Sequence, residues 1–565
     1  METKEYIVAL KKGIDYDVFW NEIENLYEDD GFVPSRRVEI SNNRSGFERI
    51  CQYFLTNEEA ELLRQDPRVS AVDLPIKDNP LLIVKSTTVQ NNNFTKPVNS
   101  TSTGNIVNYG LIRHNNSTNI YGTGTTTTET YNYVLDGTGV DIVISDSGIQ
   151  SDHPEFQYLG NSTSRVQTVN WADYVPALSS MANAYQDPDG HGTHVAGTAV
   201  GKTYGWAKGS EIYSIVATGT NAADPMDLFE AVKLWHQAKT NDRPTVLNMS
   251  WGIFYNYLAF GSTASQATNN ILANVTSVTY QGVTYPGNAS VTNYGLLLNS
   301  ANSLCLTSVV NGIPAANTTV DTALEECIDA GVVACKSAGN NSYKIDISGG
   351  ADYNNYLTYA GLGNIVYHKG SSPTAAEMVC VGSLNSVSYS ASLDQRDDYS
   401  CAGPGVDIFA CGTNIFSATT SNVFAPKYAT SAPYFLNNSY RQLNTIGTSM
   451  ASPQIAGMCA LYLQTNSGNI FSANNSANLK NWIVTNSTST MYSSGNSTSY
   501  LDDTSVLGGN AIVAYQDIQG ITQIKDSGNN WVTVANVLIK TAANTWSTVN
   551  AVWTKTTANT WVQTY

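Results

Sequence analysis

Short apolar runs alternate with amphipathic stretches through the middle of the chain. Continuous apolar runs are typical of parallel strands that are buried on both faces, and amphipathic stretches between them are typical of crossover helices. The runs are 140–145, 211–216, 245–250, 332–337 and 377–382, and the clearest helical stretches are 227–239 and 322–330. We therefore predict an α/β domain over 106–515, with a doubly wound, mostly parallel sheet. Residues 253–318 do not continue this alternation of strands and helices. They are predicted to be an insertion, without assigned elements.

Residues 1–80 have a different pattern, which predicts a separate α+β domain. Thr56 directly precedes a helical stretch, and Glu59 lies three positions after Thr56. This spacing is the signature of a capping box. The order strand, helix, strand, strand, helix, strand is that of a ferredoxin-like domain. The predicted strands are 6–10, 37–40, 47–55 and 69–74, and the predicted helices are 17–26 and 57–64. Residues 81–105, rich in Asn, Thr, Ser and Pro, are predicted to be an exposed, cleavable linker.

The last segment, 516–565, contains a repeat. Trp531, Trp546 and Trp561 recur every 15 residues, and apolar and polar positions alternate around them. This predicts a small β-rich module. Large aromatic residues dominate small cores, so we favour a core role for the tryptophans over a ligand-stacking platform for carbohydrate or a virion surface.

Composition narrows the possible functions. The 565 residues carry a formal net charge of −17, and no basic cluster exceeds short pairs, which argues against a nucleic-acid partner. No run of about 18 apolar residues predicts a membrane span. The N-terminus has no signal-peptide pattern. Eight cysteines without a C-x-x-C pair indicate reduced thiols, with a Cys401–Cys411 disulfide as the alternative.

Three segments carry candidate chemistry, and each also has a structural interpretation. Asp146 ends an apolar strand, where open parallel sheets place functional groups, although such an Asp is often a cap. His191 and His194 begin a helix of small residues. Their spacing differs from that of zinc-protease histidines, so His191 is a candidate base and His194 a core histidine. Ser449 opens another helix, whose N-terminal N–H groups favour negative charge, although serine is also a common cap.

The segments Asp146-Ser147-Gly148, Gly190-His191-Gly192-Thr193 and Gly447-Thr448-Ser449-Met450-Ala451 together resemble the signature blocks of the subtilisin-like serine proteases, in that order. The likeness is greatest to the proteinase K branch, and the whole chain looks like subtilases encoded by large tailed phages. Together with the lack of a signal-peptide pattern, this resemblance implies a location in the cytoplasm of a host cell or on a virion. The resemblance implies a serine endopeptidase with Asp146, His191 and Ser449 as catalytic triad. It also implies Asn340, in Ser337-Ala338-Gly339-Asn340, as the oxyanion-hole donor.

The same resemblance implies how a protein or peptide substrate is held. Ser250, Trp251 and Gly252 would form one strand edge and residues 217–220 the other. Ser337, Ala338 and Gly339 would wall the pocket for the residue before the scissile bond. Trp251 is expected to narrow a pocket, and Lys336 is an unexpected cation in an apolar strand.

Two further expectations come from the family. Asp407, with the backbone carbonyls of Ala376 and Met378, matches a structural calcium site, and a turn-capping role for Asp407 is the alternative. Residues 1–80 resemble an inhibitory propeptide, so the chain would be a self-processing zymogen cleaved within 81–105. The competing functional hypothesis is a catalytically idle virion or surface attachment protein.

Overall fold

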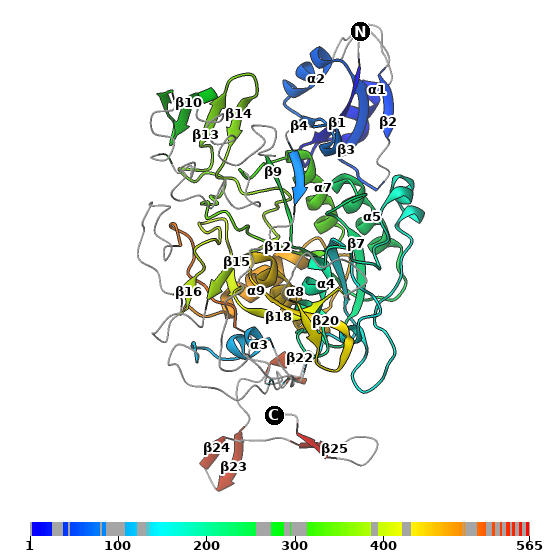
Figure 1. The fold of residues 1–565 in the computed structure, drawn as a ribbon, viewed down its shortest axis with the longest axis vertical. Coiled ribbons are helices and arrows are strands. Elements are labelled where there is room, and N and C mark those ends of the chain that lie inside the picture. Colours follow the sequence, from blue (N-terminus) through cyan, green and yellow to red (C-terminus); the bar gives the residue numbers. More distant parts are fainter. Residues whose placement is uncertain are drawn as a thin grey trace.

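The structure is a computed structural model of the 565-residue chain. It describes residues 3–24, 38–42, 46–79, 82–85, 108–120, 131, 133, 135–255, 273–287, 294, 313–385, 394–420, 431–489, 491 and 506–515. Six short strands between residues 523 and 563 are also described. Figure 1 shows the arrangement, with the N-terminal domain at the top and the C-terminal strands at the bottom.

The N-terminal domain has the predicted order of elements. These are β1 (Lys4–Leu10), α1 (Tyr16–Glu24), β2 (Glu39–Asn42), β3 (Ile50–Leu55), α2 (Asn57–Arg64) and β4 (Val69–Asp73). The strands form an antiparallel sheet in the order β2-β3-β1-β4, which confirms the ferredoxin-like prediction. The capping box is also confirmed: the Glu59 N–H donates to Thr56 Oγ1 at 3.2 Å, and the Thr56 N–H donates to Glu59 Oε2 at 2.7 Å.

A seven-stranded sheet forms the centre of the molecule. Its order is β16-β15-β12-β8-β6-β7, with β17 also paired to β15. The strands are β6 (Asp141–Asp146), β7 (Glu211–Val216), β8 (Thr245–Met249), β12 (Val333–Ser337), β15 (Val379–Asn385), β16 (Gln395–Arg396) and β17 (Ile408–Cys411). All neighbours run parallel except β15 and β16. The predicted doubly wound, mostly parallel sheet is therefore confirmed.

Helices pack around this sheet and carry the candidate residues. They are α3 (Tyr109–His114), α4 (His191–Val200), α5 (Pro225–Ala238), α7 (Thr318–Asp329), α8 (Thr448–Asn466) and α9 (Asn475–Asn486). Helices α4 and α8 pack against each other, and α8 also contacts β8, β12, β15 and β17. Helices α5 and α7 pack together, and α7 meets β1 and β4 of the N-terminal domain. None of these helices is both long and apolar enough to span a bilayer.

A second sheet occupies the region that the sequence left without elements. Strands β10 (Val275–Tyr280) and β11 (Val283–Pro286) form a hairpin that joins β13 (Tyr356–Tyr359) and β14 (Gly363–Val366) in the order β11-β10-β13-β14. The insertion thus pairs with a later hairpin that we did not predict. The turn residues Gln281 and Gly282 both have positive φ, 49° and 79°, as a type I′ hairpin turn requires.

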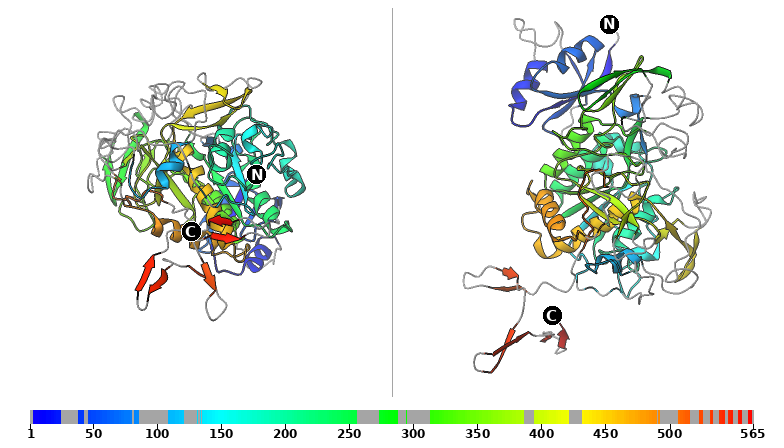
Figure 2. Two further views of the ribbon diagram at one scale, coloured as in Figure 1. Left: turned by 90° about the horizontal axis from the view of Figure 1, so that it is seen from below. Right: turned by 90° about the vertical axis from the view of Figure 1, so that its left-hand side faces the viewer.

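Three hairpins at the C-terminus follow the 15-residue repeat. They are β21–β22 (Gln523–Lys525 with Trp531–Thr533), β23–β24 (Leu538–Ala542 with Thr545–Thr548) and β25–β26 (Trp553–Lys555 with Trp561–Gln563). In each, a lysine pairs with the repeated tryptophan: Lys525 with Trp531, Lys540 with Trp546, and Lys555 with Trp561. Figure 2 shows them set apart from the central domain. The predicted core role of the tryptophan side chains lies outside the described residues.

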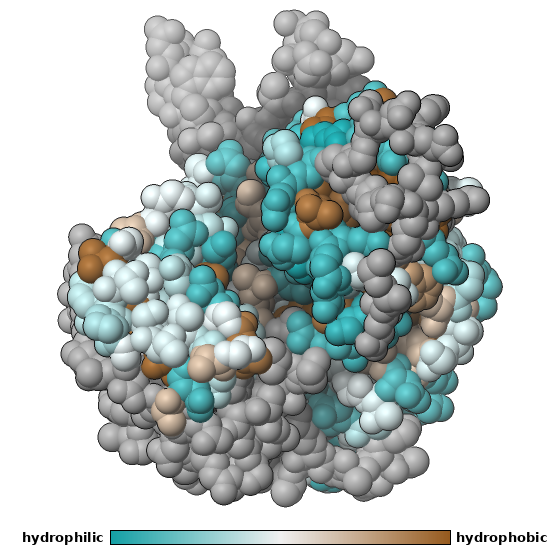
Figure 3. Space-filling model, turned by 90° about the horizontal axis from the view of Figure 1, so that it is seen from above, coloured by the Kyte–Doolittle hydropathy of each residue, from teal (hydrophilic) through white to brown (hydrophobic). Residues whose placement is uncertain are grey.

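The face of the molecule at the end where the N-terminal domain lies is mostly hydrophilic or neutral in character (Figure 3). Figure 3 shows hydrophobic residues on this face as small separate spots. Scattered exposed apolar side chains of this kind are normal on folded proteins, so this face carries no large apolar patch among the described residues.

Candidate active site

The parallel sheet places Asp146 at a carboxyl strand end, beside the ends of its two neighbours. Asp146 pairs with Val216 of β7, and the preceding Ser145 pairs with Met249 of β8. The side chain is fully buried. Its Oδ1 atom accepts a hydrogen bond from the Ser147 N–H at 2.8 Å and lies 2.6 Å from Nδ1 of His191. The carboxylate therefore fixes one ring nitrogen of His191 as a donor.

Glycines on both sides of His191 let this contact form. Gly190 directly precedes α4 and has a φ of 92°, a backbone angle that residues other than glycine rarely adopt. A Cβ atom on Gly192 would lie 2.1 Å from the Gly148 carbonyl oxygen and 3.1 Å from Cβ of Asp146. The first turn of α4 can therefore approach the end of β6 only with glycine at position 192.

A buried carboxylate that the sequence analysis missed holds the start of α4. Asp187 accepts hydrogen bonds from the N–H groups of Gly190 and Thr193, both at 2.8 Å, and from Oγ1 of Thr193 at 2.6 Å. It also accepts from the Ser147 hydroxyl at 2.9 Å, and that hydroxyl accepts from the Gly192 N–H at 2.9 Å. Burial raises the pKa of Asp187, while the hydrogen bonds favour its ionised form. Asp187 is thus a positioning residue for His191.

His194 has the structural role that its spacing predicts. It is fully buried, and its Nε2 atom lies 3.1 Å from the carbonyl oxygens of both Ile415 and Leu443. Burial lowers the pKa of the imidazole to about 3, so the ring is neutral at physiological pH. His194 joins α4 to two strands, β18 (Ile415–Thr419) and β20 (Asn437–Thr445), rather than to the candidate chemistry.

Ser449 lies in the first turn of α8, and the adjacent backbone is adapted to it. Pro453, four residues later, has no N–H to donate to the Ser449 carbonyl. The Ser250 hydroxyl supplies the missing hydrogen bond at 3.0 Å. The Ser449 hydroxyl in turn donates to the Ser250 carbonyl at 3.2 Å. These reciprocal contacts attach the helix start to the strand edge at Ser250.

Asn340 is oriented by the residue before Ser449. Its Oδ1 atom accepts from the Thr448 N–H at 2.8 Å and from the Thr448 hydroxyl at 2.7 Å. A backbone N–H can only donate, so the contacted atom is the amide oxygen and the NH₂ group is directed elsewhere as a donor. The Gly339 N–H completes this link by donating to Thr448 Oγ1 at 3.1 Å. The predicted oxyanion donor is therefore held rigidly beside the start of α8.

The predicted substrate edge carries a strand of the chain itself. Strand β5 (Leu82–Lys85) pairs antiparallel with β9 (Gly252–Tyr255), and Lys85 is opposite Gly252. The expected narrowing of a pocket by Trp251 is not what the structure shows. Its side chain is 2% exposed, and its Nε1–H donates inward to the Ser145 hydroxyl at 2.9 Å. The Trp251 side chain therefore packs into the interior instead of lining a pocket.

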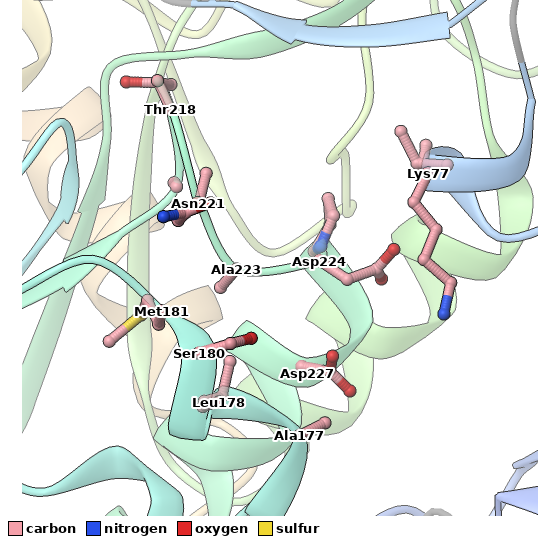
Figure 4. Close-up of a pocket in the computed structure, with 15 residues that line it drawn as sticks. Lys77, Ala177, Leu178, Ser180, Met181, Thr218, Asn221, Ala223, Asp224 and Asp227 are labelled. Atoms are coloured by element: carbon pink, nitrogen blue, oxygen red, sulfur yellow. The ribbon is translucent and has the colours of Figure 1, made fainter.

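A cavity of about 470 Å³ lies along the other predicted edge. It is bounded by Ala217–Ala223 on one side and by the 3₁₀ helix η1 (Ile76–Asp78) of the N-terminal domain on the other. Figure 4 shows Lys77 on the side where Asp224 and Asp227 of the α5 start lie. The N-terminal domain thus covers part of this edge.

The residues predicted to bind calcium do come together, but around a lysine. Nζ of Lys480 donates to the carbonyl oxygens of Ala376 at 2.7 Å and Met378 at 3.0 Å, and lies 2.9 Å from Oδ1 of Asp407. The ammonium takes the position that a cation would need, and like charges at one position repel. These residues therefore do not fit calcium, and the predicted site is corrected to an internal ion pair. Among the described residues no cluster of three or more metal-binding side chains occurs.

Seven cysteines fall in the described part of the chain, and all of them are buried and outside any disulfide, Cys401 and Cys411 included. Burial raises the pKa of the Cys380 thiol to about 12 and also raises that of Cys401. Thiols with raised pKa values are poor nucleophiles, so these cysteines are structural.

Comparison with known proteins identifies the family. Residues 137–505 match the model of the subtilase family, Peptidase S8. The chain is 29% identical over 337 residues to the subtilisin-like serine protease Cur l 4.0101 of Cochliobolus lunatus, covering 59% of this chain and 45% of the relative. It is 27% identical over 335 residues to an extracellular serine proteinase of Thermus sp. strain Rt41A, covering 59% and 53%. The chain thus spans about half the length of the curated relatives it matches.

Solved structures give similar results at lower identity. A cold-adapted subtilisin-like serine proteinase is 22% identical, with a TM-score of 0.42, and covers 73% of this chain and 98% of that one. Fervidolysin from Fervidobacterium pennivorans is 15% identical, with a TM-score of 0.49, and covers 97% and 67%. The family model alone covers well over half of the sequence, and on that match this chain belongs to the subtilase family.

Proposed function

We propose that this protein is a serine endopeptidase that cleaves peptide bonds through an acyl-enzyme. The supporting observation is the buried His191–Asp146 contact of 2.6 Å beside the helix that begins at Thr448 and carries Ser449. In the mechanism, Ser449 Oγ attacks the carbonyl carbon and His191 takes its proton. Asp146 keeps the imidazole in the correct tautomer and stabilises the imidazolium, and His191 then protonates the leaving amine.

The oxyanion of the tetrahedral intermediate needs donors that are already in place. Asn340 supplies its side-chain amide, because Thr448 holds the amide oxygen on the opposite side. The start of α8 adds the favourable field of helix N–H groups. Both donors are fixed before substrate arrives, so little reorganisation accompanies the reaction.

Active-site labelling tests this proposal. A fluorophosphonate probe should label the wild-type protein and leave Ser449→Ala unlabelled, and cleavage of a protein substrate should fall by about 10⁶ in that variant. Ser476→Ala, which removes another fully buried hydroxyl, is the matched control and should be labelled like the wild type. Wild-type protein that stays unlabelled even after the chain is cut within residues 81–105 would favour the alternative, an idle attachment protein on the same fold.

We further propose that residues 1–80, together with strand β5 at the start of the predicted linker, act as an intramolecular inhibitor. Strand β5 lies on the substrate edge of β9, where it would exclude a substrate strand. The domain is also attached by charge: Arg49, 5% exposed, pairs with Glu325 and Glu326 of α7, each at 2.9 Å. The Gly46 N–H donates to Glu230 of α5 at 2.8 Å.

Mass spectrometry after incubation tests self-processing. The wild-type chain should be cut within residues 81–105, and Ser449→Ala should stay intact. Cutting at the same bond in both proteins would show that another protease is responsible.

A further inference from the structure

Lys336 is a buried cation next to the proposed catalytic centre. It is the next-to-last residue of β12, and the chain continues through Ser337, Ala338 and Gly339 to Asn340. Its side chain is 1% exposed. Its Nζ atom donates to the Ser371 carbonyl at 2.8 Å and to Ser371 Oγ at 3.1 Å. An ammonium has three N–H donors. Within the described part of the chain, Ser371 accounts for two of them, so one remains for a ligand.

Ser371 connects this ammonium to the substrate edge. A Cβ atom on Gly252 would lie 2.3 Å from Ser371 Oγ, so the serine hydroxyl faces the Gly252 backbone directly. The next residue is bonded to the same edge, because the Ile253 N–H donates to the Ser372 carbonyl at 2.9 Å. The ammonium, the Ser371 hydroxyl and Gly252 therefore follow one another toward the edge.

A substrate strand would bring one side chain to this place. Its scissile carbonyl must lie between Ser449 and Asn340, and its backbone must run along the edge that starts at Gly252. The side chain of the residue before the scissile bond then enters between the 250–252 segment and the 337–340 segment. Lys336 directly precedes the 337–340 segment, and Ser371 contacts Gly252 of the 250–252 segment, so both residues border the two segments.

The charge of Lys336 is only weakly balanced by its surroundings. Burial lowers the pKa of Lys336, and Cys380, Asp321 and Cys401 act against that shift. Burial also raises the pKa of Asp321 to about 7, so this carboxyl is partly protonated at neutral pH. The two cysteines are thiols whose pKa values burial raises. A ligand carboxylate would therefore supply the missing counter-charge.

We propose that Lys336, with Ser371, makes this subtilase select an acidic side chain, Glu or Asp, immediately before the scissile bond. The inference rests on the proposed peptidase function and deepens it by naming the substrate class. A hydrogen bond to a charged group contributes about 1.5–3 kcal/mol, equivalent to roughly 10- to 100-fold in rate.

The test uses four fluorogenic peptides that differ only at this residue, with Glu, Gln, Leu or Lys. For the wild-type protein, kcat/KM should be at least about tenfold higher for Glu than for Gln, and lowest for Lys. In Lys336→Met the value for Glu should fall by about 10- to 100-fold, while that for Leu changes by less than about threefold. Lys208→Met, at a lysine that is 4% exposed and bonded to the carbonyls of Lys202 and Thr203, is the matched control and should keep the preference.

Each outcome separates this inference from the proposed function. If a fluorophosphonate labels Ser449 but Gln or Leu is cleaved as well as Glu, the selectivity inference fails and the peptidase stands. An equal loss for all four peptides in Lys336→Met would assign the lysine a structural role. If no peptide is cleaved and no label binds, even after the chain is cut within residues 81–105, the peptidase function fails as well. If Lys336→Met does not fold, the Glu-to-Gln ratio of the wild-type protein still decides the question.

Discussion

Two lysines of the central domain are bound by backbone carbonyls, and they differ in their counter-charge. Lys480 of α9 contacts two carbonyls and the carboxylate of Asp407 at 2.9 Å. Lys336 of β12 contacts one carbonyl and one hydroxyl, both of Ser371. The first ammonium completes an ion pair within the fold, whereas the second keeps a donor and a charge for an external partner. For these two lysines, the counter-charge therefore separates the cation assigned to the fold from the cation proposed to bind substrate.

The largest expected difference between the two lysines is in stability. Lys480→Met leaves Asp407, whose side chain is 15% exposed, without its partner and should lower the free energy of unfolding by about 2 kcal/mol, between the values for exposed and buried pairs. Lys336→Met removes a cation that has no close anionic partner among the described residues, and should leave that free energy unchanged or raise it. Urea unfolding, monitored by circular dichroism, measures the free energy of unfolding of both variants. A larger loss in Lys336→Met than in Lys480→Met would reverse the comparison.

Calcium should distinguish the wild-type protein from a variant without the Lys480 ammonium. We expect neither calcium nor a chelator to shift the unfolding midpoint of the wild type, because Lys480 takes the cation position. Lys480→Ala frees Asp407 and two carbonyls, so calcium should stabilise that variant by up to about 2.7 kcal/mol at a hundredfold excess over its Kd. Destabilisation of the wild type by a chelator would contradict the ion-pair assignment.

The charge near Lys336 should make selectivity depend on pH. The pKa of Asp321 is raised to about 7 by burial, and the groups around it include Lys336 and Tyr353. As pH rises through about 7, Asp321 becomes negative and opposes an acidic substrate. The ratio of kcat/KM for Glu over Leu should therefore fall by about tenfold between pH 6 and 8.

This ratio cancels any pH dependence of the chemical step, because both peptides share that step. Asp321→Asn should flatten the profile, because the asparagine cannot ionise. A ratio that rises with pH would show that the carboxyl does not govern the selectivity.

The smallest expected effect is that of the Ser371 hydroxyl. Ser371→Ala removes one acceptor of the Lys336 ammonium and a donor for the substrate, and it keeps the carbonyl contact. A single hydrogen bond contributes about 1 kcal/mol, so the preference for Glu over Leu should fall about fivefold. Steady-state kinetics with the two peptides measures this change. If Ser371→Ala lowers the preference for Glu over Leu as much as Lys336→Met does, the selectivity depends on the hydroxyl rather than on the ammonium.

Local patterns predicted the elements that depend on neighbouring residues. Helix α2 was predicted with its observed bounds, because Thr56 and Glu59 form a signal within four residues. Strand β7 was also predicted with its observed bounds, since it is a continuous apolar run buried on both faces. The contact of His191 with Asp146 followed from the family resemblance rather than from periodicity.

Contacts between distant segments could not be predicted in this way. Asp187 precedes His191 by only four residues, but its role depends on the Ser147 hydroxyl from another strand end. Lys480 lies on a surface helix, and nothing in its local sequence indicates that it reaches Asp407. The sheet that joins β10 to β13 was missed for the same reason, because its strands are short and come from two separate loops.

The attachment of β5 to β9 has a consequence for how the protein would be switched on. While the chain is intact, a covalent tether keeps the blocking strand at an effective concentration in the millimolar range. Once the tether is cut, β5 can return to the edge of β9 only from the free N-terminal domain in solution. Dilution lowers the concentration of that domain and therefore favours activity. No Asp or Glu occurs between Asn79 and Thr128. A protease with the selectivity proposed for Lys336 would sever its own tether slowly, and this delay would act as a timer.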